Sequence, residues 1–309
     1  MQIHRGYNKL MLKDPVVTMG IFDGVHRGHR ALIDTVVRRA SSSGGESAAI
    51  TFDPHPRLVL DSRNTNLAFL NSMDEKIQLL EKAGIDNLII IEFTPAFSKM
   101  RACDFVSEVL GRKIGTRRLV LGHDHHFGYK AEGNAATISD CAAKMGFSVE
   151  QIPGLRSKEG PVSSSLIREA LLAGNLDNAN KWLGYCYSMK GEVVRGKKIG
   201  RKLGFPTANI NPGYRYKLIP ANGVYAVEVF VTGERHTGML SIGTNPTVNT
   251  DLSERSVEVH IFDYEQDIYG QEIAVTFRYR LRDEVRFDSA TDLAVQMRND
   301  REVALRLLR

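Results

Sequence analysis

Two histidines stand three residues apart where a β-rich run gives way to a helical stretch. The run ends in DGVHRGH, with His26 and His29 on either side of Gly28. Imidazoles and backbone N–H groups at a helix N-terminus can hold a polyphosphate. Two other interpretations stay open. Asp23 and the glycines could make only a tight turn, or the histidines could bind a metal, for which no further ligand stands at helical spacing.

Three more polar clusters follow in the same half of the chain: TFDPHP (Thr51 to Pro56), LGHDHHFG (Leu121 to Gly128) and VSSSLIR (Val162 to Arg168). By composition the second cluster suggests a metal site. Adjacent loop residues cannot all point at one ion, however, so contact with an anionic or aromatic ligand is favoured. The hydroxyls and the arginine of the third cluster suit either phosphate binding or plain capping of a helix.

A basic, glycine-rich stretch, GEVVRGKKIGRKLGFPTANIN (Gly191 to Asn211), lies in the second half of the chain. Its backbone N–H groups can wrap phosphates, although the GKS or GKT ending of a P-loop is absent. In the PTAN segment, Thr207 and Asn209 share one face of an extended run. Hydroxyl and amide oxygens of this kind bind Mg²⁺, and a polar strand edge is the alternative.

A single carboxylate stands in the later segment SVEVHIFD. Alternation places Glu258 on the face opposite Val257, Val259 and Ile261. A lone Glu on a strand is usually solvated.

The elements that must position these residues differ between the two halves. In the first half, short β-rich runs alternate with helical stretches, which predicts βαβ units and a doubly wound parallel sheet. Ligands of such sheets bind at the carboxyl ends of the strands. The predicted strands are Pro15 to Phe22, Ser47 to Phe52, Asn87 to Phe93, Arg117 to Gly122 and Phe147 to Ile152, and the predicted helices are His29 to Ala40, Met73 to Ala83, Cys103 to Leu110 and Ala135 to Met145.

One further helix, from Ser163 to Ser165 onward through IREALLAGNLDNANKWLG, is predicted to close the first domain, residues 1–184. Residues 185–309 then carry strands without intervening helices, which predicts a six-stranded antiparallel barrel followed by a helix from about Ser289 to Leu308. The predicted strands are YSMKGEVVRG, PTANI, GVYAVEVFV, HTGMLSIG, SVEVHIFD and EIAVTFRYRL.

Length and composition agree with two globular domains. The chain has 309 residues, 42% of them hydrophobic and 25% charged, which excludes disorder as the main state. No apolar run approaches the ~20 residues of a membrane span and no secretion signal is recognisable, so we expect a cytoplasmic protein. A net charge of +5 suits anionic small substrates or nucleic acid.

The chain has three cysteines, Cys103, Cys141 and Cys186. They are widely spaced and form no CxxC pair, which predicts reduced thiols in the core and no zinc framework.

In the first half, FDGVHRGH, FDPHP, LGHDHHFG and VSSSLIR, in this order, resemble the adenylyltransferase module of the bacterial bifunctional riboflavin kinase and FAD synthetase family. In the second half, GKKIGRKLGFPTAN, PANGVY, SIGTNPTV, VEVHIFD, DIYGQ and LRDEVRFDS resemble the riboflavin kinase module of that family. The resemblance covers residues from about 15 to 184 and nearly all of 185–309.

The resemblance implies that riboflavin is phosphorylated by ATP to FMN, and that FMN then receives AMP from ATP to give FAD and pyrophosphate. In the second reaction the FMN phosphate is already ionised, so the site must align two anions and stabilise the leaving group. By resemblance His26, His29 and Arg168 do this, Glu258 is the base of the kinase, and Thr207 and Asn209 hold Mg²⁺.

The remaining roles also come from the resemblance. ATP and its phosphates would contact Gly20, Phe22, Asp23, Gly24, Gly28, Ser164, Ser165, Gly200, Lys202, Gly204, Pro206, Thr207 and Asn209. The flavin would contact Asp53, Pro54, His55, Pro56, Asp124, His125, Phe127, Arg286 and Ser289. The family usually has an aromatic residue where His125 stands and often an Arg near Ala131; His125 can still stack, and Lys130 can partly replace the charge.

Two alternatives compete with this interpretation. Another nucleotidylyltransferase, acting for example on pantetheine or nicotinate phosphate, would not require PTAN and Glu258. A nucleic-acid-binding protein would need a basic groove with exposed aromatics, of which Lys197 to Lys202 is the only hint. We therefore expect riboflavin, FMN, FAD and ATP as the ligands, no nucleic acid, no membrane, and a monomer or weak homo-oligomer.

Overall fold

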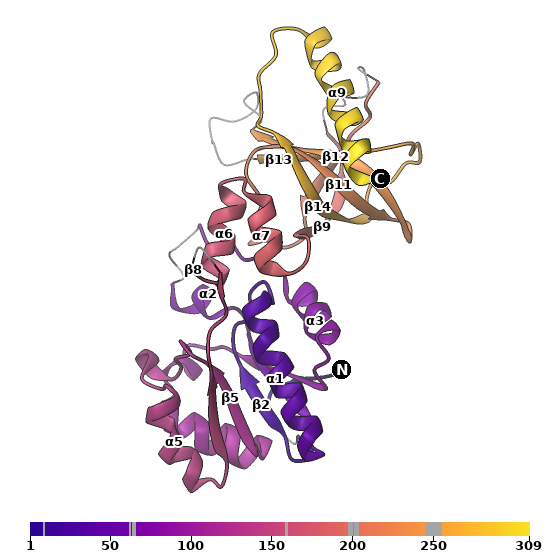
Figure 1. Cartoon of the computed structure of the whole chain (residues 1–309). Helices are drawn as coiled ribbons and strands as arrows, with labels where there is room; N and C mark the ends of the chain where they lie inside the picture. The colour runs from indigo at the N-terminus through magenta and orange to yellow at the C-terminus, as the bar shows by residue number, and fades with distance from the viewer. Residues whose placement is uncertain are drawn as a thin grey trace. The chain divides into compact units, whose positions relative to one another are not determined.

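A computed structural model describes residues 1–8, 10–61, 63, 66–157, 160–196, 200, 204–244 and 255–309. The chain forms two compact units, Met1–Ser164 and Ser165–Arg309 (Figure 1). No helix among the described residues is long and apolar enough to cross a bilayer.

A six-stranded parallel sheet forms the centre of the first unit, in the order β1-β4-β3-β2-β5-β6. It confirms the predicted doubly wound sheet and adds β1, which was not predicted. As an edge strand, β1 has a largely exposed face and lacks an apolar run. The strands are β1 (Gln2–Arg5), β2 (Val16–Met19), β3 (Ser47–Asp53), β4 (Asn87–Glu92), β5 (Arg118–Gly122) and β6 (Ser148–Ile152).

Helices cover both faces of this sheet, because its strands carry apolar residues on both sides. On one face, Val17 and Ile89 pack with residues of η2 and α5; on the other, Ala49 and Leu88 pack with residues of α1 and α3. The elements are α1 (Arg27–Ser43), α2 (Pro56–Leu60), α3 (Met73–Lys82), the 3-10 turn η1 (Phe97–Lys99), α4 (Ala102–Asp104), the π-helix η2 (Phe105–Ile114), the 3-10 turn η3 (Tyr129–Ala131), α5 (Ala135–Lys144) and the hairpin β7 (Arg156–Ser157) and β8 (Gly160–Pro161).

The single helix predicted after Ser163 is wrong, since the structure divides it into α6 (Ser164–Leu172) and α7 (Leu176–Leu183). Gly174 has a φ of 76°, which a helix cannot accommodate, and the Asn175 side chain caps α7 by accepting a hydrogen bond from Asn178 N.

Asn180 of α7 ties that helix to the barrel that follows. Its amide donates to Phe277 O, and its Oδ1 accepts from Tyr187 N. By compactness α7 and nearly all of α6 belong to the second unit. The predicted boundary between residues 184 and 185 stays a prediction.

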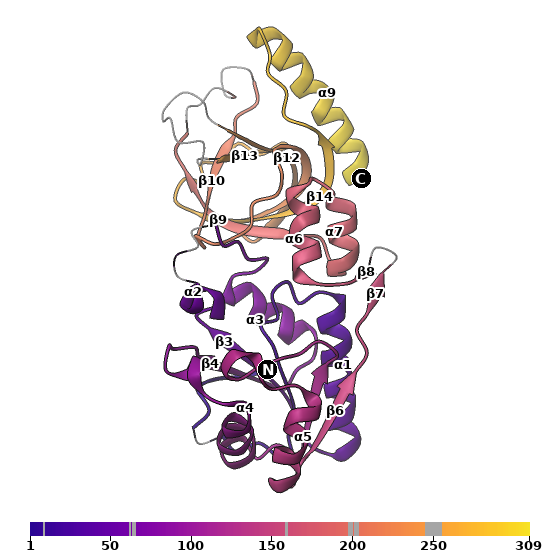
Figure 2. The same cartoon turned by 90° about the vertical axis from the view of Figure 1, so that its left-hand side faces the viewer.

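A closed barrel of six antiparallel strands in the order β10-β13-β12-β11-β14-β9 forms the rest of the second unit, as predicted (Figure 2). The predicted terminal helix is also confirmed: α9 (Ala290–Leu308) begins at the N-cap Ser289 and buries Phe262, Met239 and Ala304 against the outside of the barrel. The strands are β9 (Ser188–Val194), β10 (Ala208–Pro212), β11 (Gly223–Val231), β12 (Glu234–Thr244), β13 (Arg255–Ile261) and β14 (Glu272–Arg282).

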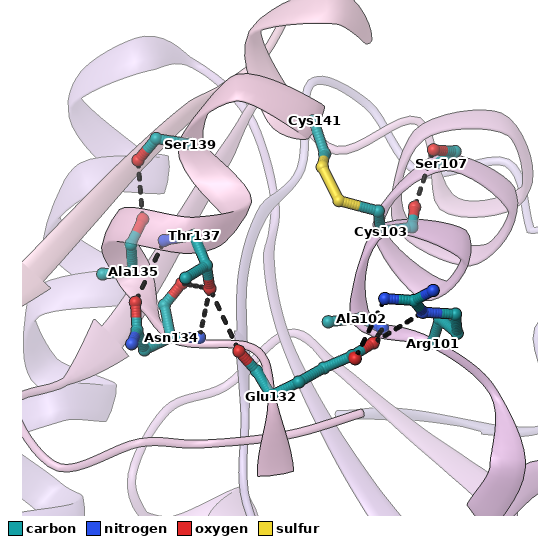
Figure 3. Close-up of a disulfide and its surroundings, with 10 residues drawn as sticks. All are labelled: Arg101, Ala102, Cys103, Ser107, Glu132, Asn134, Ala135, Thr137, Ser139 and Cys141. Carbon is teal, nitrogen blue, oxygen red and sulfur yellow. Dashed lines mark hydrogen bonds and ion pairs between the residues drawn. A yellow bond between two sulfur atoms is a disulfide. The ribbon is translucent and has the colours of Figure 1, made fainter. Parts of the chain in front are cut away.

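The expectation of three reduced core cysteines is wrong for Cys103 and Cys141, whereas Cys186 is a free thiol as expected. Cys103 and Cys141 form a disulfide across 38 residues of sequence, which joins α4 to α5 (Figure 3). Cys103 is exposed, Cys141 half-buried, and the free Cys186 also half-buried. Sequence spacing did not reveal the pair because only the packing of α5 beside α4 brings the two sulfurs together.

Candidate active sites

The turn between β2 and α1 is an unusual backbone segment. Phe22, Gly24 and Val25 have positive φ angles of 52°, 83° and 34°, which are costly for the two non-glycine residues. Asp23 orders this turn from inside, because its Oδ1 accepts hydrogen bonds from the backbone N–H groups of Leu70 at 2.8 Å and Asn71 at 3.3 Å. The phosphate-binding role expected of Asp23 stays a prediction.

His26 and His29 are stacked at the start of α1, with ring centroids 3.7 Å apart. His26 Nδ1 accepts the backbone N–H of His29 at 3.3 Å and so caps the helix. A Cβ on Gly28 would meet the His26 ring at 3.1 Å, so a glycine here leaves room for the imidazole. In its neutral form His26 therefore carries its proton on Nε2, which can donate to an anion.

Burial keeps both rings uncharged at neutral pH. It lowers the pKa of His26 to about 4, with Asp124 opposing the shift. Burial also lowers the pKa of His29 well below its usual value, and the charges of His26, Lys76 and His125 lower it further. The pair can therefore stabilise phosphate by hydrogen bonds rather than by charge.

One of the predicted blocks, the LGHDHHFG loop, lies near this turn. Asp124 acts electrostatically on His26, and His125 acts on His29, so the LGHDHHFG loop faces the histidine pair. Burial lowers the pKa of His125 to about 4, and its ring lies 5.8 Å from that of Phe127. Within the described residues no group of three or more metal-ligating side chains converges.

The other histidines of that loop point to different partners. A Cβ on Gly154 would lie 2.3 Å from the His123 ring, so His123 packs against Gly154. His126 Nδ1 lies 3.0 Å from the carbonyl oxygen of Asp124. The Asp124 side chain is 82% exposed, and its Oδ1 lies 3.5 Å from His123 Nδ1.

The FDPHP block follows β3 and begins α2. A cis peptide joins Asp53 to Pro54. His55 caps α2 by accepting the backbone N–H of Arg57 at 3.1 Å, and its ring stacks on Phe69 at 4.0 Å, while Pro56 occupies the first turn. The flavin contacts expected of these residues stay predictions.

Lys76 also belongs to this cluster, although sequence reasoning missed it. It lies in α3, is only 5% exposed, and interacts electrostatically with Asp23, Asp53 and His29. A signal was present in the sequence, because Lys76 stands three residues after Met73 and four before Leu80, inside the apolar stripe of the predicted helix.

Ser164, Ser165 and Arg168 open α6 at the junction of the two units. Ser164 Oγ donates to Asp23 O at 2.8 Å, which fixes the end of the first unit to the turn between β2 and α1. Ser165 and Arg168 belong to the second unit, where Arg168 Nη2 donates to Ser165 Oγ at 3.1 Å.

Gly20, for which an ATP contact was predicted, directly follows β2. Its backbone N–H donates to Ile50 O at 3.0 Å.

The second site lies on the barrel. Thr207 Oγ1 donates to Glu258 Oε2 at 3.0 Å, and Asn209 stands directly opposite Glu258 in the β10–β13 ladder. Cross-strand partners point to the same face, while Val257 and Val259 fill the interior, at 2% and 0% exposure. The structure therefore brings together the three polar residues predicted for the kinase.

Two glycines lie against these side chains. A Cβ on Gly200 would lie 2.3 Å from Phe205 O and 3.4 Å from Thr207 Oγ1, and one on Gly196 would lie 2.0 Å from Asn209 Nδ2. Pro206 O lies 2.8 Å from His260 Nδ1, and Gly204 has a φ of 82°. Lys202 and the other residues of the loop, 197–199, 201 and 203, lie outside the described residues.

The predicted flavin contacts of the second unit lie before α9. Ser289 is the N-cap of that helix: its Oγ accepts Asp292 N at 3.1 Å and donates to Asp292 Oδ2 at 2.7 Å. Arg286 is exposed in the preceding loop. Capping thus accounts for Ser289, and both flavin contacts stay predictions.

Two family models match the chain in consecutive segments. The FAD synthetase family matches residues 8–166 and the riboflavin kinase family matches residues 183–308. These segments carry the histidine cluster and the Thr207, Asn209 and Glu258 cluster, respectively.

Similar proteins extend the match over nearly the whole chain. A bifunctional riboflavin kinase/FMN adenylyltransferase of Listeria monocytogenes is 37% identical over 93% of this chain and 90% of its own. One of Haemophilus influenzae is 36% identical over 98% of both chains. A crystal structure named a macrolide-efflux protein, from Streptococcus pneumoniae, superposes with a TM-score of 0.89 at 31% identity, covering 98% of this chain and 99% of its own.

Proposed function

Because this chain belongs to the family of bifunctional riboflavin kinase/FMN adenylyltransferases, we propose that its two residue clusters are the two active sites of that pair of reactions. The chain converts riboflavin to FMN and FMN to FAD, using ATP in both steps. The adenylyltransferase site is the histidine cluster of the first unit, and the kinase site is the Glu258 cluster of the barrel.

In the adenylyltransferase step, an oxygen of the FMN phosphate attacks the α-phosphorus of ATP. The bond from that phosphorus to the pyrophosphate oxygen breaks, and pyrophosphate leaves. No general base is needed because the nucleophile is already an anion. His26 and His29, neutral and preorganised by stacking and by the start of α1, donate hydrogen bonds to the charge that develops on the leaving group.

The roles of the other first-site residues follow from this arrangement. Ser164 and the backbone of the turn from Gly20 to Gly28 bind the phosphates of ATP, and the phosphate contacts expected of Ser165 and Arg168 stay predictions. The flavin contacts Asp124, His125 and Phe127. The imidazole of His125 and the phenyl ring of Phe127 offer faces on which it can stack. The FDPHP segment, Asp53 to Pro56, completes the flavin pocket.

In the kinase step, the 5′-hydroxyl of riboflavin attacks the γ-phosphorus of ATP, and the bond to ADP breaks. Here the nucleophile is a neutral alcohol, so Glu258 accepts its proton. Gly196 and Gly200 let the glycine-rich loop approach Thr207 and Asn209 closely, which suits a nucleotide held against this edge by Gly200, Lys202, Gly204 and Pro206. Arg286 and Ser289 contact the flavin.

Mg²⁺ fits the kinase site by the chemistry of its donors. The Thr207 hydroxyl and the Asn209 amide oxygen are hard ligands beside a carboxylate. When bound with ATP, the ion offsets the charge of the phosphates. In this protein Thr207 and Asn209 would hold it.

The observation that carries the proposal is the hydrogen bond between Thr207 and Glu258, with Asn209 opposite, in the same chain as the stacked histidines. A time course of purified protein with riboflavin, ATP and Mg²⁺ tests it, with riboflavin, FMN and FAD separated by chromatography. FMN should rise first and then give way to FAD. Accumulation of FMN without FAD would contradict the first site. Absence of FMN would contradict the second site, and FAD formation from supplied FMN would then test the first site separately.

The name of the similar crystal structure points to a different activity, macrolide efflux. Both family models and the curated relatives name the flavin reactions instead, and the residues of both sites suit phosphate chemistry. The lack of nucleic-acid partners, the monomeric or weakly oligomeric state and the location in the cytoplasm stay predictions.

A further inference from the structure

We propose that Lys76 is a phosphate-binding residue of the adenylyltransferase site, its ammonium group meeting the oxygens of the ATP triphosphate or of the departing pyrophosphate. This inference rests on the proposed adenylyltransferase function and adds a residue that none of the sequence motifs contains. Three observations support it: the way α3 is attached, the burial of Lys76, and the charges around it.

The segment that leads into α3 is hydrogen-bonded to the turn between β2 and α1. Asp23, which lies between β2 and α1, accepts the backbone N–H groups of Leu70 and Asn71. Ser72 then caps α3 through a reciprocal capping box with Glu75. Lys76 N donates to Ser72 O at 3.0 Å, so Lys76 stands in this anchored first turn and has a defined position relative to His29.

The Lys76 side chain is buried without a close partner. It is 5% exposed, yet within the described residues its ammonium group makes no hydrogen bond or ion pair. A lysine is almost never this buried unless it is paired. Burial lowers the pKa of Lys76 to about 8, while Asp23 and Asp53 oppose the shift, so the group is still mostly charged at neutral pH.

The surroundings point to a phosphate as the missing partner. His26, His29 and His125 are neutral at pH 7. Lys76 therefore supplies the charge that the imidazoles lack, beside the anion site at the start of α1. Ammonium groups bind phosphate oxygens as point charges, and a low-dielectric setting strengthens that interaction.

The competing explanation is that Lys76 only balances the charges of Asp23 and Asp53. The substitution Lys76→Met separates the two. Met is unbranched and only one heavy atom shorter than Lys, so the substitution keeps most of the packing and removes the buried charge, which is often neutral or stabilising when the residue has no essential partner. Lys76→Arg keeps the charge, and Lys82→Met, at an exposed position in the last turn of the same helix, is the matched control.

The experiment measures FAD formation from FMN and ATP, the Kd of inorganic pyrophosphate by calorimetry, and the melting temperature of each full-length variant. For Lys76→Met we expect the KM for ATP and the Kd for pyrophosphate to rise at least about tenfold, as for loss of a hydrogen bond to a charged group. The KM for FMN, the kinase activity and the melting temperature should stay as in the wild type. Lys76→Arg should retain most of the binding, and Lys82→Met all of it.

Several outcomes would overturn the inference. The first is an unchanged KM for ATP and Kd for pyrophosphate in Lys76→Met. The second is an equal loss of ATP and pyrophosphate binding in Lys76→Arg or in Lys82→Met. The third is unfolding of Lys76→Met, which would mean that Lys76 serves to pair with the carboxylates. If instead the wild type forms no FAD from FMN and ATP, the proposed function itself has failed.

Discussion

Thr207 and Glu258 are 51 residues apart in sequence, and the Thr207 hydroxyl donates to the Glu258 carboxylate at 3.0 Å. The antiparallel pairing of β10 with β13 creates this contact. It holds one oxygen of the proposed base beside the residue proposed to bind Mg²⁺.

The first prediction concerns that base. Glu258→Ala should lower riboflavin phosphorylation by about 10²–10⁴-fold, the usual effect of losing a general base. FAD formation from supplied FMN should be unchanged, since the histidine cluster lies in the other unit. Separate assays of the two steps check this, and retained kinase turnover would refute the assignment.

The second prediction concerns the adenylyltransferase. His29→Ala should lower FAD formation from FMN by about 10²–10³-fold, as for removal of one preorganised donor. Riboflavin phosphorylation by the same preparation serves as the control and should persist. Equal loss of both activities would mean that the two sites are not independent.

The third prediction tests the close approach of the glycine-rich loop. Gly200→Ala places a Cβ 2.3 Å from Phe205 O, which must displace the backbone beside Thr207. We expect a loss of kinase activity with a raised KM for ATP. Gly213→Ala, where a Cβ meets nothing within 4 Å, should behave as the wild type in the same assay.

The fourth prediction concerns the disulfide between Cys103 and Cys141. It closes a loop that contains Asp124 and His125, and Glu132 within that loop pairs with Arg101 and with Ala102 N (Figure 3). Cys141→Ser should destabilise the first unit by about 2–4 kcal/mol, the usual effect of such a cross-link. Denaturant unfolding measures this.

The matched control is Cys186→Ser, because Cys186 is a free cysteine. Its unfolding midpoint should stay close to that of the wild type. A reducing agent should lower the stability of the wild type but not that of Cys141→Ser. If reduction has no effect on the wild type, the cross-link does not form in solution.

The fifth prediction is a pH dependence. Burial holds the folded pKa of His26 at about 4, against 6.5 for the unfolded chain. Between these values the unfolded state binds the proton and the folded state does not, so stability falls as the pH drops from about 6.5 toward 4. By the size of the shift the loss is on the order of 3 kcal/mol.

Chemical denaturation of the wild type and of His26→Gln at pH 7 and pH 5 measures the effect. The difference between the two pH values should be smaller in His26→Gln than in the wild type. His126→Gln, at an exposed position, should keep the full dependence. An identical pH dependence in all three proteins would contradict the assignment to His26.

The sequence alone determined the two architectures and grouped Thr207, Asn209 and Glu258 as candidates for one site. Alternating strands and helices predicted the parallel sheet, and six turn-separated strands predicted the barrel, because each pattern reflects which faces of an element are buried. Alternation also placed Glu258 on the face opposite Val257 and Val259, and the family resemblance predicted that Glu258 acts with Thr207 and Asn209. The edge strand β1 was not predicted because it is polar and lacks an apolar run. The break at Gly174 was missed although Gly174 and the capping residue Asn175 are a local helix-break signal.

Tertiary structure alone decided the properties that depend on neighbours distant in sequence. The pairing of Cys103 with Cys141 depends on α4 and α5 packing side by side. The neutral state of His26 and His29 comes from desolvation, which no spacing reveals. Lys76 joins their cluster only because Asp23 anchors α3 to the turn before α1. Desolvation and charge are set by everything that surrounds a group, and so they are known only once the chain has folded.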